Sequence, residues 1–270
     1  MASYVVTGSN RGIGLAFIRN LSANPNNTVF ALTRNKANSA DLLELQSKLK
    51  NVHVLQADIT DVPALREAAK EVERVAGGAL DVLINNGAYL ALDRGDFTLD
   101  AYDGKEDLLD KDFTDFFKVN TLGVIKTINV FLPLLRKASE KSLAKVITIS
   151  TGASDLEFTV NAGFWWFAPY ATSKSATNMV MAKYAAAHKQ ENILFLSISP
   201  GAVNSANAPP NEVEATFGPM IKVFQSGYPE WNGVFLTPEQ SVSLMLGTIS
   251  KLSVKDSGAF ISQYGDKAWL

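Results

Sequence analysis

The apolar residues of the chain fall into short runs that alternate with longer stretches of helical pattern. Most of the short runs are continuously apolar, which is typical of strands covered by helices on both faces of a parallel sheet. The expected strands are residues 4–7, 29–32, 52–56, 81–85, 146–150, 194–199 and 259–262, and the expected helices are residues 13–23, 39–50, 61–76, 113–138, 171–190 and 238–251.

This alternation predicts an α/β fold with one Rossmann-type, doubly wound domain over residues 1–270, in which helices cover both faces of a seven-stranded parallel sheet. Two regions interrupt the alternation. Residues 89–112 are rich in aspartate and glutamate, and we expect a solvated loop there. Residues 202–237 contain four prolines and are expected to cover the substrate. Both regions follow strands and should lie at the carboxyl edge of the sheet, where such sheets bind ligands.

Composition and charge exclude several classes of function. The 270 residues include no cysteine, which rules out disulfides, thiolate metal sites and cysteine catalysis. His53 and His188 are too far apart to suggest a metal centre, so no bound metal is predicted. The net charge of −2 gives no reason to expect nucleic acid as a partner. No apolar run is long enough to span a membrane and no secretory signal precedes the first strand, so a cytoplasmic protein is expected.

A glycine-rich segment joins the first expected strand to the first expected helix. Glycines at this point let the backbone turn tightly and approach a pyrophosphate, and the helix N-terminus offers free N–H groups to the anion. The alternative is a glycine-rich turn that binds nothing. The segment therefore predicts a dinucleotide site that includes Gly8, Asn10, Arg11, Gly12, Ile13 and Gly14.

A tyrosine and a lysine lie four residues apart at the start of the expected helix 171–190. Residues at this spacing share one helix face, so Tyr170 and Lys174 should point the same way. A free phenol, with a pKa of about 10, is a weak acid at neutral pH, and a nearby ammonium group lowers that pKa. The pair therefore predicts an acid–base group, with two unrelated surface residues as the alternative.

The end of the second expected strand bears on the choice of nicotinamide. Sites that prefer NAD usually place a carboxylate there to bind the ribose 2′-hydroxyl, but this strand ends at Thr33 and Arg34. A guanidinium group can bind a 2′-phosphate through paired hydrogen bonds. NADP(H) is therefore expected over NAD(H), unless Arg34 is only a surface arginine.

These motifs together resemble one known family. The segment Thr7–Gly14 resembles the TGxxxGIG signature of the classical short-chain dehydrogenases/reductases, and Tyr170 with Lys174 resembles their YxxxK motif. The stretch from Gly258 to Trp269 is similar to a subgroup of small carbonyl reductases that includes the C-factor, sniffer and norsolorinic-acid-reductase-like proteins. Beyond the glycine segment and Arg34, the resemblance assigns the cofactor site to Asp58, Ile59, Asn85, Asn86, Gly87, Tyr170, Lys174, Pro200, Gly201, Val203 and Ser205.

The resemblance also implies a mechanism. Tyr170 would protonate a carbonyl oxygen as hydride arrives from the nicotinamide, while Lys174 holds the nicotinamide ribose and lowers the pKa of the tyrosine. Asn120 would hold a water in the proton relay, or satisfy a kink in its helix. A hydroxyl after the fifth strand would polarise the carbonyl. Alignment with the family motif at this position selects Thr151, with Ser150 as the alternative.

We therefore expect an NADPH-dependent reductase of hydrophobic ketones or aldehydes, reversible as an alcohol dehydrogenase. A non-catalytic NADP(H)-binding sensor is the alternative, but such proteins typically lose the tyrosine or the lysine. The aromatic run 164–167 would either line the substrate pocket or a subunit contact, or cover the sheet edge. Many relatives pair through helices equivalent to 113–138 and 171–190, so a homo-oligomer, either dimer or tetramer, is expected.

Overall fold

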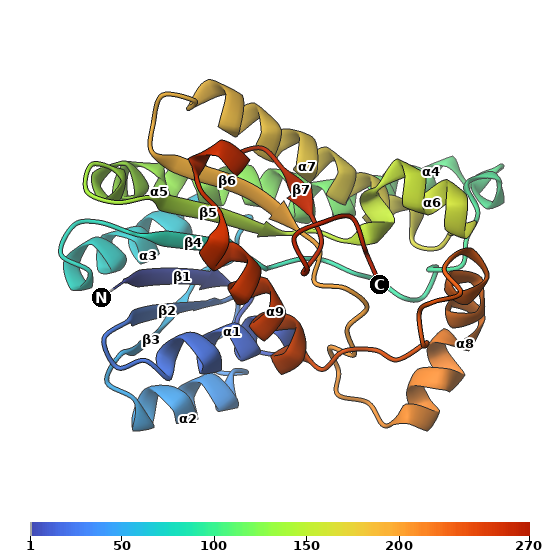
Figure 1. Cartoon of the computed structure of the whole chain (residues 1–270), viewed down its shortest axis with the longest axis horizontal. Coiled ribbons are helices and arrows are strands. Elements are labelled where there is room, and N and C mark those ends of the chain that lie inside the picture. Colours follow the sequence, from blue (N-terminus) through green and yellow to red (C-terminus); the bar gives the residue numbers. More distant parts are fainter. Residues whose placement is uncertain (1) are drawn as a thin grey trace.

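The computed structural model describes residues 2–270, which form a central seven-stranded sheet (Figure 1). The strand order is β3-β2-β1-β4-β5-β6-β7, and every neighbouring pair is parallel. The predicted Rossmann-type fold is therefore confirmed. The strands are β1 (Ser3–Thr7), β2 (Thr28–Thr33), β3 (Val52–Gln56), β4 (Val82–Asn85), β5 (Ala144–Ile149), β6 (Ile193–Ile198) and β7 (Phe260–Ile261).

Helices cover both faces of this sheet. One face carries α1, α2 and α9, and the other carries α3, α5 and α7. None of the helices formed by residues 2–270 combines the length and apolarity needed to cross a membrane. The bounds are α1 (Gly12–Ser22), α2 (Ala40–Lys48), α3 (Val62–Val75), α5 (Val124–Ser139), α7 (Ala168–Ala187) and α9 (Pro238–Lys251).

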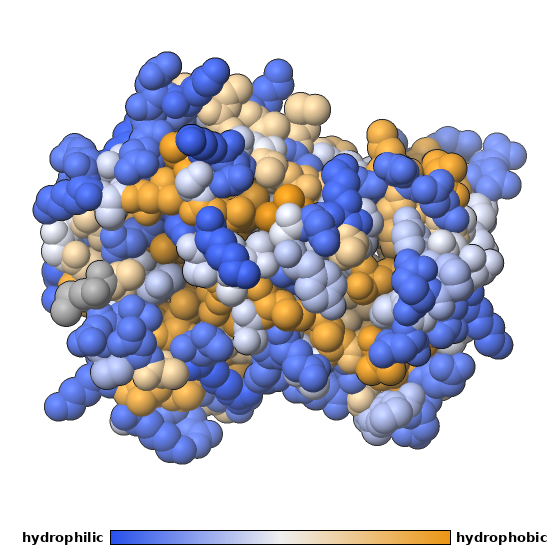
Figure 2. Space-filling view, in the orientation of Figure 1, coloured by the Kyte–Doolittle hydropathy of each residue, from blue (hydrophilic) through white to orange (hydrophobic). Residues whose placement is uncertain are grey.

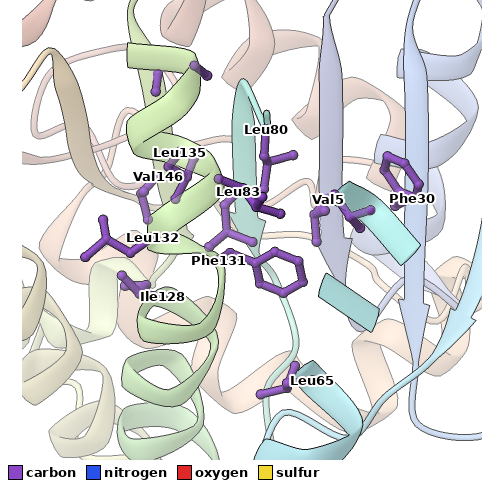
Figure 3. Close-up of a cluster of buried hydrophobic side chains, with 14 of the residues drawn as sticks. Val5, Phe30, Leu65, Leu80, Leu83, Ile128, Phe131, Leu132, Leu135 and Val146 are labelled. Carbon is purple, nitrogen blue, oxygen red and sulfur yellow. The ribbon is translucent and has the colours of Figure 1, made fainter. Parts of the chain in front are cut away.

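The continuous apolar runs of the strands supply two hydrophobic cores, because successive strand residues point to opposite faces. Val5 of β1 belongs to the core under α3, α5 and α7, whereas Val6 belongs to the core under α1, α2 and α9. In Figure 3, Phe131 of α5 approaches Leu83 of β4 and Val5 of β1. Burial on both faces therefore explains why alternation between apolar and polar residues is absent from these strands.

Helix starts follow the local signals in the sequence. The side chain of Asp61 accepts a hydrogen bond from the main-chain N–H of Ala64 at the start of α3. At the start of α9, Thr237 and Gln240 form a reciprocal capping box around Pro238. Side-chain caps of this kind satisfy N–H groups that have no partner within the helix, which fixes where the helix begins.

The expected helix 113–138 is interrupted in the structure. It consists of α4 (Glu106–Phe117), a π-helical turn η2 (Lys118–Gly123) and α5. Bonds to neighbouring segments accompany the interruption: Thr177 Oγ1 donates to the main-chain oxygen of Asn120 at 2.8 Å, and Thr121 Oγ1 donates to that of Ser173 at 2.9 Å. Turns of π-helix are rare and often mark functional sites. Hydrophobic periodicity alone did not indicate this break.

The acidic stretch 89–112 is not the solvated loop that its composition predicts. It contains a short 3-10 turn, η1 (Leu99–Tyr102), and the first residues of α4. Asp112 is only 5% exposed, and it accepts two hydrogen bonds of 2.8 Å from the guanidinium group of Arg94 and one of 2.9 Å from the hydroxyl of Tyr102. The stretch is therefore anchored by a buried carboxylate, and most of its other acidic side chains remain exposed.

Three further helical elements lie beyond the carboxyl ends of the strands: η3 (Gly152–Ser154), α6 (Leu156–Ala162) and α8 (Pro210–Gly227). In Figure 1, α6 and α8 stand at the right, past the arrowheads of the sheet, and Figure 2 shows apolar surface in the same region. A third apolar cluster joins these helices to the end of the chain through Phe158, Phe164, Phe224 and Trp269. The region 202–237 is therefore largely helical, with α8 held on an aromatic cluster.

Candidate active site

The fold brings the expected site residues to the carboxyl edge of the sheet. Three of these residues come from helices: Asn120 lies in the π-helical turn η2, and Tyr170 and Lys174 lie in the first two turns of α7. The others follow strands: Gly8, Asn10, Arg11, Gly12, Ile13 and Gly14 after β1; Arg34 after β2; Asp58 and Ile59 after β3; Asn85, Asn86 and Gly87 at the end of β4; Ser150 and Thr151 after β5; and Pro200, Gly201, Val203 and Ser205 after β6.

The glycines after β1 are required by close packing of the main chain. Gly8 has a φ of +65°, and a Cβ atom on it would lie 2.6 Å from the Cα atom of Gly87. A Cβ atom on Gly14 would lie 2.2 Å from the carbonyl oxygen of Gly8. Gly12 has a φ of +53° and lies against the main chain of Ser205. The segment can therefore turn sharply into α1 while the ends of β4 and β6 pack on it.

The N-terminus of α1 is suited to an anion. Arg11 occupies the N-cap position without a capping bond from its side chain, and the first turn of α1 holds no acidic residue. Arg11 and Arg34 are both exposed. Uncapped N–H groups at a helix N-terminus favour phosphate, and guanidinium groups add charge-assisted hydrogen bonds. These residues therefore fit the phosphates of a dinucleotide, including a 2′-phosphate.

Two adjacent asparagines at the end of β4 have different environments. The Nδ2 atom of Asn86 donates to the main-chain oxygens of Thr7 and Gly8, at 3.1 and 3.0 Å, and so ties β4 to the glycine segment. Asn85 Nδ2 donates to Thr148 Oγ1 at 3.2 Å, whereas its buried Oδ1 atom has no hydrogen-bond partner within residues 2–270. Asn85 therefore has one unpaired buried acceptor at the end of β4, while Asn86 maintains the local fold.

The segments after β3 and β6 are fixed by local bonds. The Oδ1 atom of Asp58 accepts from the main-chain N–H and the hydroxyl of Thr60, both at 2.8 Å. The carbonyl oxygen of Pro200 accepts from Ser241 Oγ at 2.7 Å, and Val203 forms a parallel bridge to the segment that precedes α9. The strand order of the sheet reverses between β1 and β4, and these two segments have defined positions on either side of that point.

Tyr170 and Lys174 share one face of α7. The Nζ atom of Lys174 lies 5.9 Å from the centre of the Tyr170 ring and donates to the carbonyl oxygen of Ile149 at 2.7 Å. Lys174 is 2% exposed, and burial lowers its pKa to about 8. Burial also raises the pKa of Tyr170 to about 12, so the expected lowering by Lys174 is not what the structure shows. The phenol therefore carries its proton at neutral pH, and the raised pKa makes it a weaker acid than a free tyrosine.

Asn120 connects the π-helical turn to the catalytic helix and to the segment after β4. Its Oδ1 atom accepts from the main-chain N–H of Tyr89 at 2.7 Å, and its Nδ2 atom donates to the carbonyl oxygen of Tyr89 and to Ser173 Oγ, both at 3.0 Å. Ser173 Oγ in turn donates to the carbonyl oxygen of Tyr170 at 2.7 Å. The side chain of Asn120 therefore holds the first turn of α7 in place.

The two hydroxyls at the end of β5 have different partners. Ser150 is buried, and its Oγ atom donates to Asn178 Oδ1 at 2.7 Å and lies 3.3 Å from Ser154 Oγ. Thr151 is half-buried, and its Oγ1 atom accepts from the main-chain N–H of Ala153 at 3.2 Å. The proton of Ser150 is thus engaged within the protein, whereas the proton of Thr151 is available to an external acceptor.

Phe116 of α4 borders Tyr170 and is covered by Tyr89 from the acidic stretch, and sequence reasoning missed both. The ring of Phe116 lies 6.3 Å from that of Tyr170, and the ring of Tyr89 lies 4.8 Å from Phe116, measured between centres. Phe167 adopts a left-handed conformation with a φ of +57°, and its N–H donates to the carbonyl oxygen of Gly95 at 2.7 Å. The only available signal was the position of residues 89–112 after β4, at the ligand-binding edge.

The aromatic run 164–167 divides between core and surface. Phe164 is buried in the cluster with Phe158 and Phe224, whereas Trp165 is about half exposed and stacks on Trp166 with ring centres 3.8 Å apart. Four consecutive aromatic residues therefore do not serve one function. Phe164 covers the end of the sheet, and the stacked pair is left partly open to solvent.

Comparisons with known proteins agree with this geometry. The family described as short chain dehydrogenase matches residues 3–214. The short-chain dehydrogenase/reductase atnB of Arthrinium sp. is 41% identical over 274 aligned residues, and AacuF of Aspergillus aculeatus, described in the same words, is 42% identical over 272. Each alignment covers 100% of both chains.

Solved structures show the same fold. The NADPH-bound carbonyl reductase from chicken fatty liver aligns over 98% of each chain, with a TM-score of 0.79 and 29% identity. Carbonyl reductase Sniffer of D. melanogaster aligns over the same share, with a TM-score of 0.76 and 24% identity. The match to the family and the whole-length similarity to its members agree with the glycine segment, the Tyr170–Lys174 pair and the sheet order. The chain therefore belongs to the short-chain dehydrogenase/reductase family of oxidoreductases.

Proposed function

We propose that this enzyme is an NADPH-dependent carbonyl reductase that transfers hydride to a hydrophobic ketone or aldehyde, and that it oxidises the alcohol in the reverse direction. The observation that carries the proposal is the half-buried ring of Tyr170, whose centre lies 5.9 Å from the Nζ atom of Lys174 at the carboxyl edge of the sheet. The chicken carbonyl reductase, which binds NADPH, supports the same activity.

The cofactor proposed is NADP(H). When bound, it supplies the hydride for the carbonyl carbon. Arg34 and Arg11 would bind the 2′-phosphate, since both are exposed and β2 ends without a carboxylate. The uncapped N-terminus of α1 would hold the pyrophosphate, Asp58 the adenine, and the segment after β6 the nicotinamide.

The proton moves from Tyr170. In reduction, its hydroxyl gives a proton to the carbonyl oxygen as negative charge develops there. Thr151 donates a hydrogen bond to the same oxygen, because its hydroxyl proton is not used within the protein. Lys174 would bind the nicotinamide ribose hydroxyls, and the main-chain oxygen of Asn120 in η2 would hold a water that restores the proton.

The substrate class proposed is apolar. The ring of Phe116 lies against Tyr170 and is itself covered by Tyr89, and the aromatic cluster that supports α8 lies beyond the same edge of the sheet. Residues 202–237, including α8, would cover the bound substrate. An apolar surround excludes water and favours hydrophobic ketones over sugars.

The proposal is tested by following NADPH consumption with a panel of aromatic ketones, aliphatic ketones and sugars at matched concentration. We expect turnover with the apolar carbonyl compounds and little with sugars. Turnover restricted to sugars would overturn the substrate class. NADH supporting reduction as well as NADPH would overturn the cofactor assignment.

We also propose a homo-oligomer, a dimer or a tetramer. Leu122 in η2 and Met179 in α7 are apolar and about half exposed on the helices that would form the contact. Light scattering of the purified protein tests this directly. A single species with the mass of one chain across the micromolar range would contradict it.

A further inference from the structure

Residues 262–270 fold back over the loop that carries Thr151. After β7 the chain turns sharply, since the main-chain N–H of Ser262 donates to the oxygen of Asp266 at 2.7 Å and Ser262 Oγ donates to Asp266 Oδ1 at 2.7 Å. The turn brings Trp269 into the third apolar cluster, where it is 5% exposed. Its ring stacks on Phe260 of β7 with centres 4.4 Å apart, so the sheet fixes the position of the indole.

Trp269 lies directly against Gly152, the residue after Thr151. A Cβ atom on Gly152 would lie 2.6 Å from Cβ and 3.0 Å from Cγ of Trp269. On its other side, the N–H of Gly152 donates to Ser199 Oγ at 3.0 Å. Gly152 is thus held between the end of β6 and the indole, with no room for a side chain.

A second contact joins the same two segments. The Nζ atom of Lys267 lies 3.2 Å from Oδ2 of Asp155, and Oδ1 of Asp155 accepts from the N–H of Phe158 to begin α6. Residues 267 and 269 therefore hold the two ends of the loop 152–155. An exposed lysine contributes little by itself, so the apolar contact of Trp269 is the main restraint.

The position of the Thr151 hydroxyl depends on this loop. Its Oγ1 atom accepts from the N–H of Ala153, and its carbonyl oxygen accepts from Ser154 Oγ at 2.6 Å. A shift of Gly152 would move both donors. A hydrogen bond aimed at a developing oxyanion is sensitive to displacements of about 1 Å, which can lower rates by about a hundredfold.

We propose that Trp269 is a positioning residue for the reaction: it holds Gly152 and thereby orients the hydroxyl of Thr151 toward the substrate carbonyl. This inference rests on the proposed function, in which Thr151 polarises that carbonyl. Its consequence is that the segment after β7, far from the glycine segment and Tyr170 in the sequence, controls the catalytic step and not cofactor binding.

The first test compares Trp269→Ala with Trp269→Phe, which retains a ring against Gly152. We expect Trp269→Ala to lower kcat about tenfold or more, with NADPH affinity by fluorescence titration within about twofold of wild type. Trp269→Phe should recover most of the rate. The control for lost stability is Leu21→Ala, a buried truncation in α1, which should leave kcat unchanged. Equal losses of kcat in Trp269→Ala and Leu21→Ala would overturn the proposal.

The second test places Trp269→Ala in a Thr151→Val background. If Trp269 acts through Thr151, the double variant is no slower than Thr151→Val alone, because the hydroxyl to be positioned is already missing. A further tenfold loss would show that Trp269 does not act through Thr151. A near-normal rate of Thr151→Val alone would instead refute the proposed role of that hydroxyl. Should Trp269→Ala not fold, Gly152→Ala, which presses a methyl group on the indole, should show the same dependence on Thr151.

Discussion

Ser150 gives its hydroxyl proton to Asn178, while the adjacent Thr151 only accepts a bond, from the N–H of Ala153. Consecutive strand residues point to opposite faces, so the two hydroxyls at the end of β5 are directed differently. The hydroxyl of Thr151 is the one that can still donate to a substrate. This difference favours Thr151, the residue that alignment with the family motif selects, over Ser150.

Thr151→Val should lower kcat by about a hundredfold with a smaller change in KM, because the lost hydrogen bond acts mainly in the transition state. Thr151→Ser should remain active. Ser150→Ala should affect stability more than rate, by about 1–2 kcal/mol, since it leaves Asn178 without its donor. Steady-state kinetics on the three variants checks this assignment. A normal Thr151→Val beside an inactive Ser150→Ala would reverse it.

Arg34→Ala should weaken NADPH binding much more than NADH binding. The guanidinium group is exposed at the end of β2, where it would pair with the 2′-phosphate that only NADPH carries. Fluorescence titration with both cofactors measures the difference. The matched control is Arg19→Ala, a surface arginine paired with Asp41 and Glu239, which should change neither affinity. Equal losses for the two cofactors in Arg34→Ala would rule out the role.

The buried ammonium of Lys174 should make stability depend on pH. Its pKa is about 8 in the folded protein and 10.5 for an unburied lysine, so the unfolded chain binds more protons between these values. Above pH 10.5 the lysine is neutral in both states and costs the folded protein nothing. As pH falls from 10.5 through 8, the folded protein progressively loses stability, because burial disfavours the charged form. Lys174→Met removes this dependence, and its advantage over wild type should grow by about 3 kcal/mol from high to low pH. Denaturant unfolding across that range measures it; a constant difference would be inconsistent with a buried charge.

The ion pair that anchors the acidic stretch should contribute to stability. Asp112→Asn removes the charge of the buried carboxylate and leaves the half-buried Arg94 with Asp93 as its charged partner, so we expect a loss of about 1–3 kcal/mol in the free energy of unfolding. The matched control on the same helix is Asp115→Asn, whose pair with Lys111 is exposed and should contribute little to stability. Similar effects of the two substitutions would show that Asp112 does not anchor the stretch.

Local patterns in the sequence predicted the sheet, its helices and the edge that carries the site. The continuous apolar runs indicated strands that are buried on both faces of the sheet. The spacing of Tyr170 and Lys174 indicated that the two side chains share one helix face. These features depend on residues close together in the chain. The sheet order then follows from the short connections of such folds.

Features that depend on distant contacts were not predictable in the same way. The partner of Asp112 is Arg94, and nothing in an acidic run distinguishes one buried carboxylate from its exposed neighbours. The contact between Trp269 and Gly152 joins two residues that are far apart in the sequence. The raised pKa of Tyr170 also reflects burial, which the spacing to Lys174 does not reveal. Tertiary packing decides each of these.

The most direct test of the account is hydride transfer in Tyr170→Phe, measured in a single turnover with NADPH and a ketone substrate. The ring is retained, so the fold and the NADPH affinity should match wild type, while loss of the proton donor should lower the rate by about 10²–10⁴-fold. A variant that binds NADPH normally and reduces the ketone at more than about a tenth of the wild-type rate would contradict the assignment of Tyr170 as the acid.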